Sequence, residues 1–102
     1  MINPNLNLSR EKIAEFCRRH QIRRLSLFGS ATREDFGPDS DVDVLVEFDD
    51  SAQASLYDLV DMQDELSQIL GKRSVDLATP SILRNPFRRR TIVKDLETIY
   101  AS

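Results

Sequence analysis

The sequence predicts an α/β fold, a small mixed sheet with helices packed on it. Segments whose apolar residues recur at helical spacing alternate along the chain with short apolar runs of strand character. Turn formers such as glycine and proline separate most of these segments, and their order is helix, strand, turn, strand, helix, strand, helix. A chain of 102 residues has room for one hydrophobic core, so we expect a single domain over residues 1–102.

The first helix is expected over residues 9–19. Leu8 and Ile13 flank Ser9 as a hydrophobic staple flanks an N-cap. A second helix is indicated by apolar residues at helical spacing, and Gly71 supplies its C-cap. The expected apolar residues of this second helix are Leu56, Leu59, Val60, Leu66 and Leu70.

Prolines mark the start of the last helical part of the chain. Thr79-Pro80 and Asn85-Pro86 each join an N-cap residue to a proline that suits the first helical position. We therefore expect the last helix to begin near Asn85. Its apolar stripe is expected to consist of Phe87, Ile92, Leu96, Ile99 and Tyr100.

Three strands are expected between these helices. They are short apolar runs bounded by turn residues, and they lie within residues 24–28, 41–48 and 72–78. The segments between them indicate one or two helical turns over residues 30–35, a turn over 37–40 and a loop over 49–55.

Composition and charge exclude several classes of function. The formal net charge of −3 gives no basic footprint for direct nucleic-acid binding, and the arginines at 88–90 are typical of a solvated helix face rather than an anion site. The lone Cys17 excludes an internal disulfide and is expected to pack in the core. No apolar run approaches the roughly 18 residues that span a bilayer. We therefore expect a cytoplasmic protein without a membrane partner.

Asp41 and Asp43 stand at the head of the second expected strand. Because side chains alternate faces along a strand, both carboxylates should point to the same side, about 7 Å apart at Cα. They could then converge on one metal ion, or on two ions roughly 3.5 to 4 Å apart. Oxygen ligands suit magnesium or manganese rather than zinc.

A structural role is the competing interpretation of these aspartates. Taken alone, the pattern favours Asp39 and Asp41 as turn or cap residues and Asp43 as an exposed residue at a sheet edge. A calcium loop does not fit, because its sixth position would be Val44 instead of glycine and its twelfth Asp50 instead of glutamate.

Gly29 and Ser30 favour the interpretation of Asp41 and Asp43 as metal ligands over a purely structural role. Gly29 ends a strand and opens a short helical segment, where the missing Cβ lets backbone amides approach an anion. The common nucleotide motifs do not fit, since Glu34 stands where they need glycine. Alone, the Gly-Ser pair is more often a plain turn. Beside a metal site, it favours binding of a magnesium-bound triphosphate.

Three features together resemble the signature of the polymerase-beta-like nucleotidyltransferases. Gly29-Ser30 is followed after ten residues by Asp41-x-Asp43, and Asp76 lies in a Val-Asp-Leu segment where that superfamily has its third carboxylate. With the LFGS lead-in and the DSDVDVLVEF block, the chain from about residue 8 to 100 is similar to a minimal nucleotidyltransferase domain. The resemblance implies the polymerase-beta-like fold.

The resemblance also implies a role for each carboxylate. Asp41 and Asp43 would hold two magnesium ions. Asp76 would complete the shell of one ion and help to activate the attacking hydroxyl.

For the nucleotide, the resemblance implies that Gly29 and Ser30 hold the terminal phosphates of ATP. Arg33 would neutralise phosphate charge, with a solvated helix position as an equal alternative. Glu34 and Asp35 depart from the family pattern, which often has glycine after that arginine, and they add negative charge beside the triphosphate. If they face the pocket, they should weaken nucleotide binding.

Members of this family are commonly antitoxins whose partner is a HEPN-domain ribonuclease toxin. The resemblance implies transfer of AMP from ATP to a hydroxyl of the toxin, typically a tyrosine, which blocks RNA cleavage. Two alternatives remain: an antitoxin that neutralises the toxin by binding alone, and nucleotidyl transfer to a small molecule. The second is disfavoured because the sequence has no second domain to hold a small acceptor.

Overall fold

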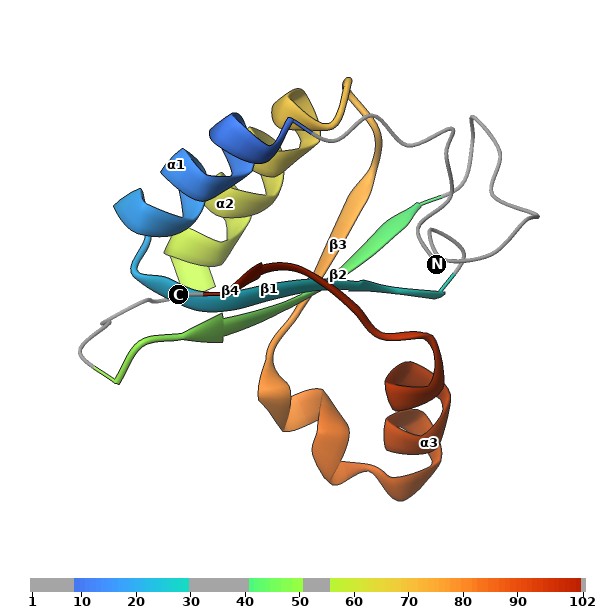
Figure 1. Cartoon of the computed structure of the whole chain (residues 1–102). Helices are drawn as coiled ribbons and strands as arrows, with labels where there is room; N and C mark the ends of the chain where they lie inside the picture. The colour runs from blue at the N-terminus through green and yellow to red at the C-terminus, as the bar shows by residue number, and fades with distance from the viewer. Residues whose placement is uncertain (1–8, 30–40, 51–55, 102) are drawn as a thin grey trace.

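A computed structural model of the chain describes residues 9–29, 41–50 and 56–101. These ranges form a four-stranded sheet with helices on both faces (Figure 1). The strands are β1 (Ile22–Phe28), β2 (Val42–Phe48), β3 (Val75–Ala78) and β4 (Glu97–Ala101). The helices are α1 (Arg10–Arg19), α2 (Leu56–Ile69), the 3-10 helix η2 (Pro80–Arg84) and α3 (Pro86–Asp95). The predicted α/β fold with a mixed sheet is confirmed.

The strand order β3-β2-β1-β4 puts β1 and β2 in the centre of the sheet. β1 pairs antiparallel with both β2 and β4, whereas β2 and β3 run parallel. A parallel pair needs a long crossover connection, and α2 lies within the connection here. Because β2 and β3 run parallel, both strands begin at the same end of the sheet.

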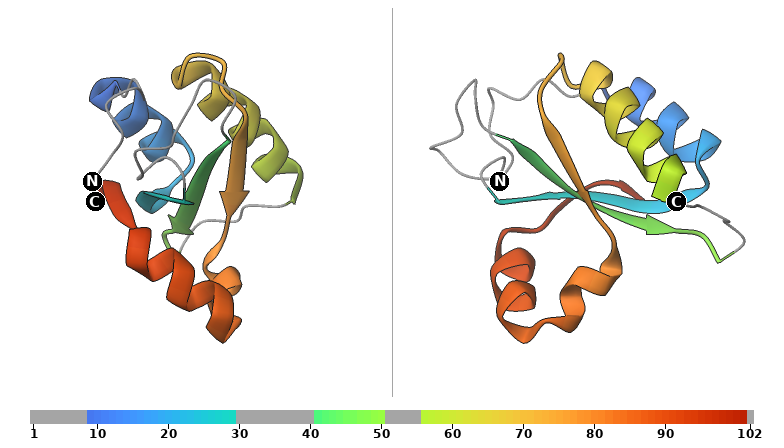
Figure 2. Two further views of the ribbon diagram at one scale, coloured as in Figure 1. Left: turned by 90° about the vertical axis from the view of Figure 1, so that its right-hand side faces the viewer. Right: turned by 180° about the vertical axis from the view of Figure 1, so that it is seen from behind.

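The two faces of the sheet carry separate helical layers, as the views in Figures 1 and 2 show. α1 and α2 cover one face, where the larger core cluster packs around the fully buried Phe16, Leu25 and Val44. η2 and α3 cover the other face, where Phe28, Leu45 and Ile92 form a smaller cluster. Both faces of β2 are therefore buried over much of its length, which explains its nearly continuous apolar run.

The first two helices follow the sequence prediction closely. Ser9 is the N-cap of α1 and accepts a hydrogen bond from the Lys12 backbone nitrogen at 3.4 Å. α2 ends one residue before Leu70, and Gly71 adopts a φ of +82° after it, as a C-cap glycine does. One apolar assignment is wrong, because Val60 is 67% exposed. No helix in the described ranges is long and apolar enough to cross a bilayer.

The end of the chain differs from the prediction. The last helix stops at Asp95, and Ile99 and Tyr100 belong to β4 instead of a helical stripe. Thr, Ile and Tyr are residues that favour strands, and β1 offers an edge for them to pair with. Ser26 of β1 is fully buried, and its hydroxyl lies 3.3 Å from that of Thr98 on β4. The predicted stripe was also wrong at Phe87, which is 82% exposed.

Other boundaries shift by a few residues or fall outside the description. β1 starts at Ile22, two residues before the expected start, and β3 is confined to the second half of its predicted range. The N-cap at Asn85 is confirmed, since its side chain accepts hydrogen bonds from two backbone nitrogens of α3. The segments expected over 30–35, 37–40 and 51–55, and Leu8 of the staple, lie outside the described residues.

Cys17 packs in the core, as predicted. Its side chain is fully buried, and burial raises the pKa of the thiol to about 12 against the opposing charge of Arg18. The thiolate is the reactive form of cysteine. We therefore expect a thiol reagent such as Ellman's reagent to leave the folded protein unmodified and to react fully in denaturant. Rapid, complete reaction of the folded protein would contradict this assignment.

One carboxylate links α1 to α2. Glu65 of α2 accepts a hydrogen bond from Arg19 and lies 2.8 Å from Nε2 of His20. Burial by itself would raise the pKa of Glu65, but the hydrogen bonds and charges of His20 and Arg19 together outweigh it. The pKa of Glu65 therefore lies below its ordinary value of 4.5.

This link should make a small part of the stability depend on pH. A carboxyl whose pKa is lowered by folding stabilises the fold above its unfolded pKa, and the contribution is lost as the pH falls through the folded pKa. Because Glu65 is 29% exposed, we expect at most about 1 kcal/mol. The unfolding midpoints of the wild type and Glu65→Gln should differ at about pH 6, and the difference should shrink at a pH well below the ordinary pKa of 4.5. An equal difference at both pH values would argue against the link.

Candidate active site

Asp43 occupies the middle of the sheet, between two neighbouring strands. On β2 it is in register with Phe28 of β1 and with Asp76 of β3. Register neighbours in a sheet share a face, and adjacent strands lie about 4.8 Å apart. Asp43 and Asp76 therefore project together from the face that carries η2 and α3. Asp43 is half-buried, and Asp76 is exposed.

Gly29 makes room for the Asp43 side chain. Gly29 follows the last residue of β1 and has a φ of +69°, a conformation that residues with a side chain rarely adopt. A Cβ at this position would overlap the Oδ2 atom of Asp43 and lie 3.4 Å from its Cγ. The sequence predicted a glycine that admits a phosphate. The structure adds a second reason for glycine here, which is close contact with a carboxylate.

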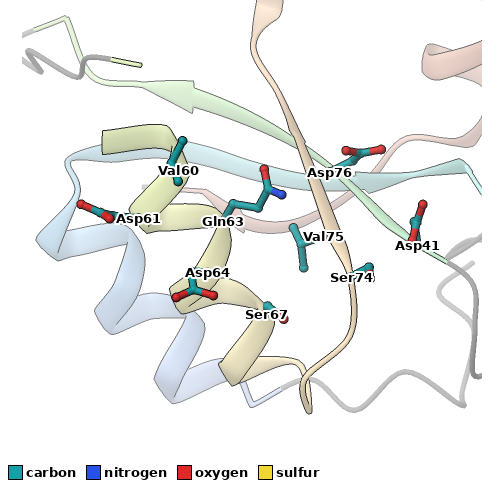
Figure 3. Close-up of a pocket in the computed structure, with 9 residues that line it drawn as sticks. All are labelled: Asp41, Val60, Asp61, Gln63, Asp64, Ser67, Ser74, Val75 and Asp76. Carbon is teal, nitrogen blue, oxygen red and sulfur yellow. The ribbon is translucent and has the colours of Figure 1, made fainter. Parts of the chain in front are cut away.

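Asp41 lies just before the first residue of β2 and is exposed. It lines a cavity of about 510 Å3 together with Asp76 and residues of α2. Figure 3 shows Gln63 extending from α2 toward β3 in this cavity, with Asp41 and Asp76 on the side of the strands. Asp76 is thus the carboxylate common to this cavity and to the face that carries Asp43.

Two further cavities open on the opposite face of the sheet, against α3. One has a volume of about 380 Å3 and includes Gly29 and Asp43 in its wall. The other measures about 240 Å3 and includes Asp43 and Asp76. The α2-side cavity is larger, but it contains neither Gly29 nor Asp43. We place the centre of the site at Asp43, because its carboxylate lines both cavities on the α3 side and contacts Gly29.

The donor set fits a hard divalent cation. Asp43 and Asp76 are oxygen donors on neighbouring positions of parallel strands, and without a cation their charges would repel each other. Within the described ranges, no three acidic, histidine or cysteine side chains lie close enough together to hold an ion. The three-carboxylate site with two magnesium ions therefore stays a prediction. The structure supports the pair of Asp43 and Asp76 most strongly.

Several predicted nucleotide contacts cannot be placed. Ser30 and Arg33 lie outside the described residues, as do Glu34 and Asp35. Their expected roles, and the concern that the two acidic residues weaken nucleotide binding, stay predictions. The described part of the site is therefore Gly29 with the carboxylates of Asp43, Asp76 and, at the start of β2, Asp41.

Comparison with known proteins decides the family. Residues 10–99 match the family described as the nucleotidyltransferase domain. The chain belongs to this family. It is therefore a nucleotidyltransferase.

Individual relatives agree with the family. The protein adenylyltransferase MntA of Thermococcus cleftensis is 33% identical to this nucleotidyltransferase over 82 residues, which cover 80% of this chain and 79% of MntA. A solved structure that is provisionally described as a minimal nucleotidyltransferase is 31% identical, with a TM-score of 0.66 and coverage of 86% of each chain. The resemblance to the minimal nucleotidyltransferase domain is confirmed.

A third similarity concerns the fold. A chain in a toxin-antitoxin crystal structure with AMP-PNP superposes on this nucleotidyltransferase with a TM-score of 0.70. It is 20% identical, and the match covers 93% of this chain and 75% of that chain. The fold predicted from the polymerase-beta-like signature is confirmed by these neighbours.

Proposed function

We propose that this nucleotidyltransferase is an antitoxin that transfers AMP from ATP to a hydroxyl of a cognate HEPN-domain toxin, most simply a tyrosine. The observation that carries the proposal is the register of Asp43 with Asp76 beside Gly29. The name of the relative MntA, a protein adenylyltransferase, and the toxin-antitoxin structure with AMP-PNP support the choice of reaction and partner.

The reaction requires one bond to form and one to break. The acceptor oxygen attacks the α-phosphorus of ATP, the bond from that phosphorus to the bridging oxygen breaks, and pyrophosphate leaves. Magnesium ions, when bound, neutralise the phosphate charge and orient the attacking and leaving oxygens. In the proposal Asp41 and Asp43 hold these ions, and Asp76 completes one shell and takes part in removing the proton from the acceptor hydroxyl.

The remaining residues orient the nucleotide. Gly29, with Ser30 and Arg33, holds the terminal phosphates, so that pyrophosphate leaves away from the acceptor. Ser30 and Arg33 follow Gly29 in the chain, and Gly29 contacts the same carboxylate that holds the metal. Phosphate binding and metal binding are therefore adjacent at the end of β1.

The direct test is to incubate the protein with magnesium, ATP and the product of the neighbouring gene, and to measure the intact mass of that product. We expect its mass to rise in steps of one AMP and its ribonuclease activity to fall in parallel. Omission of ATP is the control. An unchanged mass, in a preparation where the two proteins form a complex, would overturn the proposal.

A further inference from the structure

The three consecutive arginines of α3 do not share one environment. Arg88 lines both cavities on the Asp43 side of the sheet. Arg89 and Arg90 instead line a separate cavity of about 400 Å3 with Pro86, Val93 and Lys94. All three arginines are exposed, yet Arg88 is the one that borders the candidate active site.

Two local features hold Arg88 in this position. The Asn85 side chain accepts hydrogen bonds from the backbone nitrogens of Phe87 and Arg88, at 3.0 and 3.3 Å, which fixes the first turn of α3. One turn later on the same helix face, Ile92 is 4% exposed and packs with Phe28 and Leu45. Residues four apart lie on one face of a helix, so Arg88 is held above the sheet near Asp43.

The charge environment of Arg88 indicates what it binds. Two carboxylates, Asp43 and Asp76, line the smaller cavity with it. Among residues 9–29, 41–50 and 56–101, no ion pair involves the Arg88 guanidinium. A cation beside a carboxylate pair can offset the charge of an anion that those carboxylates would otherwise repel. A guanidinium matches phosphate oxygens with two parallel hydrogen bonds.

We propose that the guanidinium of Arg88 binds the phosphate chain of the nucleotide, near the α-phosphate at which the bond breaks. The proposal rests on the proposed function, because that function places a nucleoside triphosphate at Asp43. In this arrangement α3 forms part of the wall of the cavity that also contains Gly29, and Phe28, Phe87 and Ile92 supply its apolar surface.

The test is the equilibrium affinity for α,β-methylene-ATP with magnesium, which cannot undergo AMP transfer. Arg88→Ala should raise the Kd about tenfold to hundredfold, as expected for loss of a charge-assisted hydrogen-bonding pair. Arg88→Lys should have an intermediate effect, because it keeps the charge and loses the paired geometry. Arg90→Ala is the matched control and should change the Kd by less than about twofold, because Arg90 faces the other cavity. Circular dichroism checks that each variant is folded.

The outcomes separate this proposal from the proposed function. Equal Kd values for Arg88→Ala and Arg90→Ala would overturn the role of Arg88 in nucleotide binding. This holds even if Arg88→Ala weakens the complex with the toxin. Wild-type protein that binds the analogue but transfers no AMP would overturn the proposed function and leave the Arg88 comparison valid. Wild-type protein that binds no nucleotide would overturn both.

Discussion

Asp43→Asn is expected to lower the rate of AMP transfer by at least about 10^3-fold, because metal-bound charge stabilisation is worth several kcal/mol and each 1.36 kcal/mol is tenfold in rate. Asn keeps the shape of the side chain but removes the charge that would hold a cation. Asp43 is half-buried beside Asp76, so the substitution also relieves repulsion between two carboxylates. The folded state should therefore persist while activity is lost. Initial rates and a thermal unfolding curve check the two halves of this prediction.

A matched control distinguishes the two faces of the sheet. Asp61→Asn makes the same chemical change in the larger cavity against α2, which also contains Asp41 and Asp76. It should alter the rate by less than about threefold, since exposed surface charges contribute little. Comparable losses of transfer rate in Asp43→Asn and Asp61→Asn would indicate that the active site lies in the α2-side cavity.

The Asp43→Asn variant also decides whether the antitoxin acts by catalysis or by binding alone. If Asp43→Asn still forms the complex and still protects cells from the toxin, the antitoxin acts by masking its partner. If it forms the complex and loses protection, transfer of AMP is required. The second result is the one that we expect.

Gly29→Ala should reduce transfer strongly, by about 10^2-fold or more, while costing only modest stability. The new Cβ would overlap Oδ2 of Asp43, and a carboxylate can rotate away from such an overlap at small cost. Its displacement by about 1 Å is enough to lower a rate about 10^2-fold. The loss of activity should therefore exceed what the loss of stability explains.

Gly71→Ala is the control for backbone strain. Gly71 also has a positive φ, of +82°, but a Cβ there would meet nothing within 4 Å. Each alanine should cost about 1 to 2 kcal/mol from the left-handed backbone conformation. Similar unfolding free energies with unequal activities would support the contact between Gly29 and Asp43. Equal activities would show that the Asp43 carboxylate does not depend on this glycine.

Local patterns predicted most of the fold. The N-cap at Ser9, the glycine after α2 and the proline at the start of α3 each act through neighbouring residues, so the sequence carries them directly. β4 was missed because Ile99 and Tyr100 also fit a helical stripe, and the competing partner, β1, is more than 70 residues away in the chain. Long-range pairing of this kind has no local signal beyond strand propensity.

The site shows the same division between local and long-range information. The family signature implied that Asp76 joins Asp41 and Asp43 in one site, and the register of β2 with β3 puts Asp76 next to Asp43. The contact between Gly29 and Asp43 could not be predicted, because it depends on how β1 ends beside β2. The arginines at 88–90 were interpreted together as a solvated face. The turn of α3 directs Arg88 to one cavity and Arg89 and Arg90 to another. This difference depends on how α3 packs on the sheet, so the local sequence does not indicate it.

Transfer of the AMP part of ATP can be tested most directly by following the fate of a radioactive label. ATP radiolabelled at the α-phosphate or at the γ-phosphate would be supplied in parallel to the protein, magnesium and the toxin partner. We expect the α-label to be covalently bound to the toxin and the γ-label to be released as pyrophosphate. Transfer of γ-label to the toxin, or transfer of neither label, would contradict it.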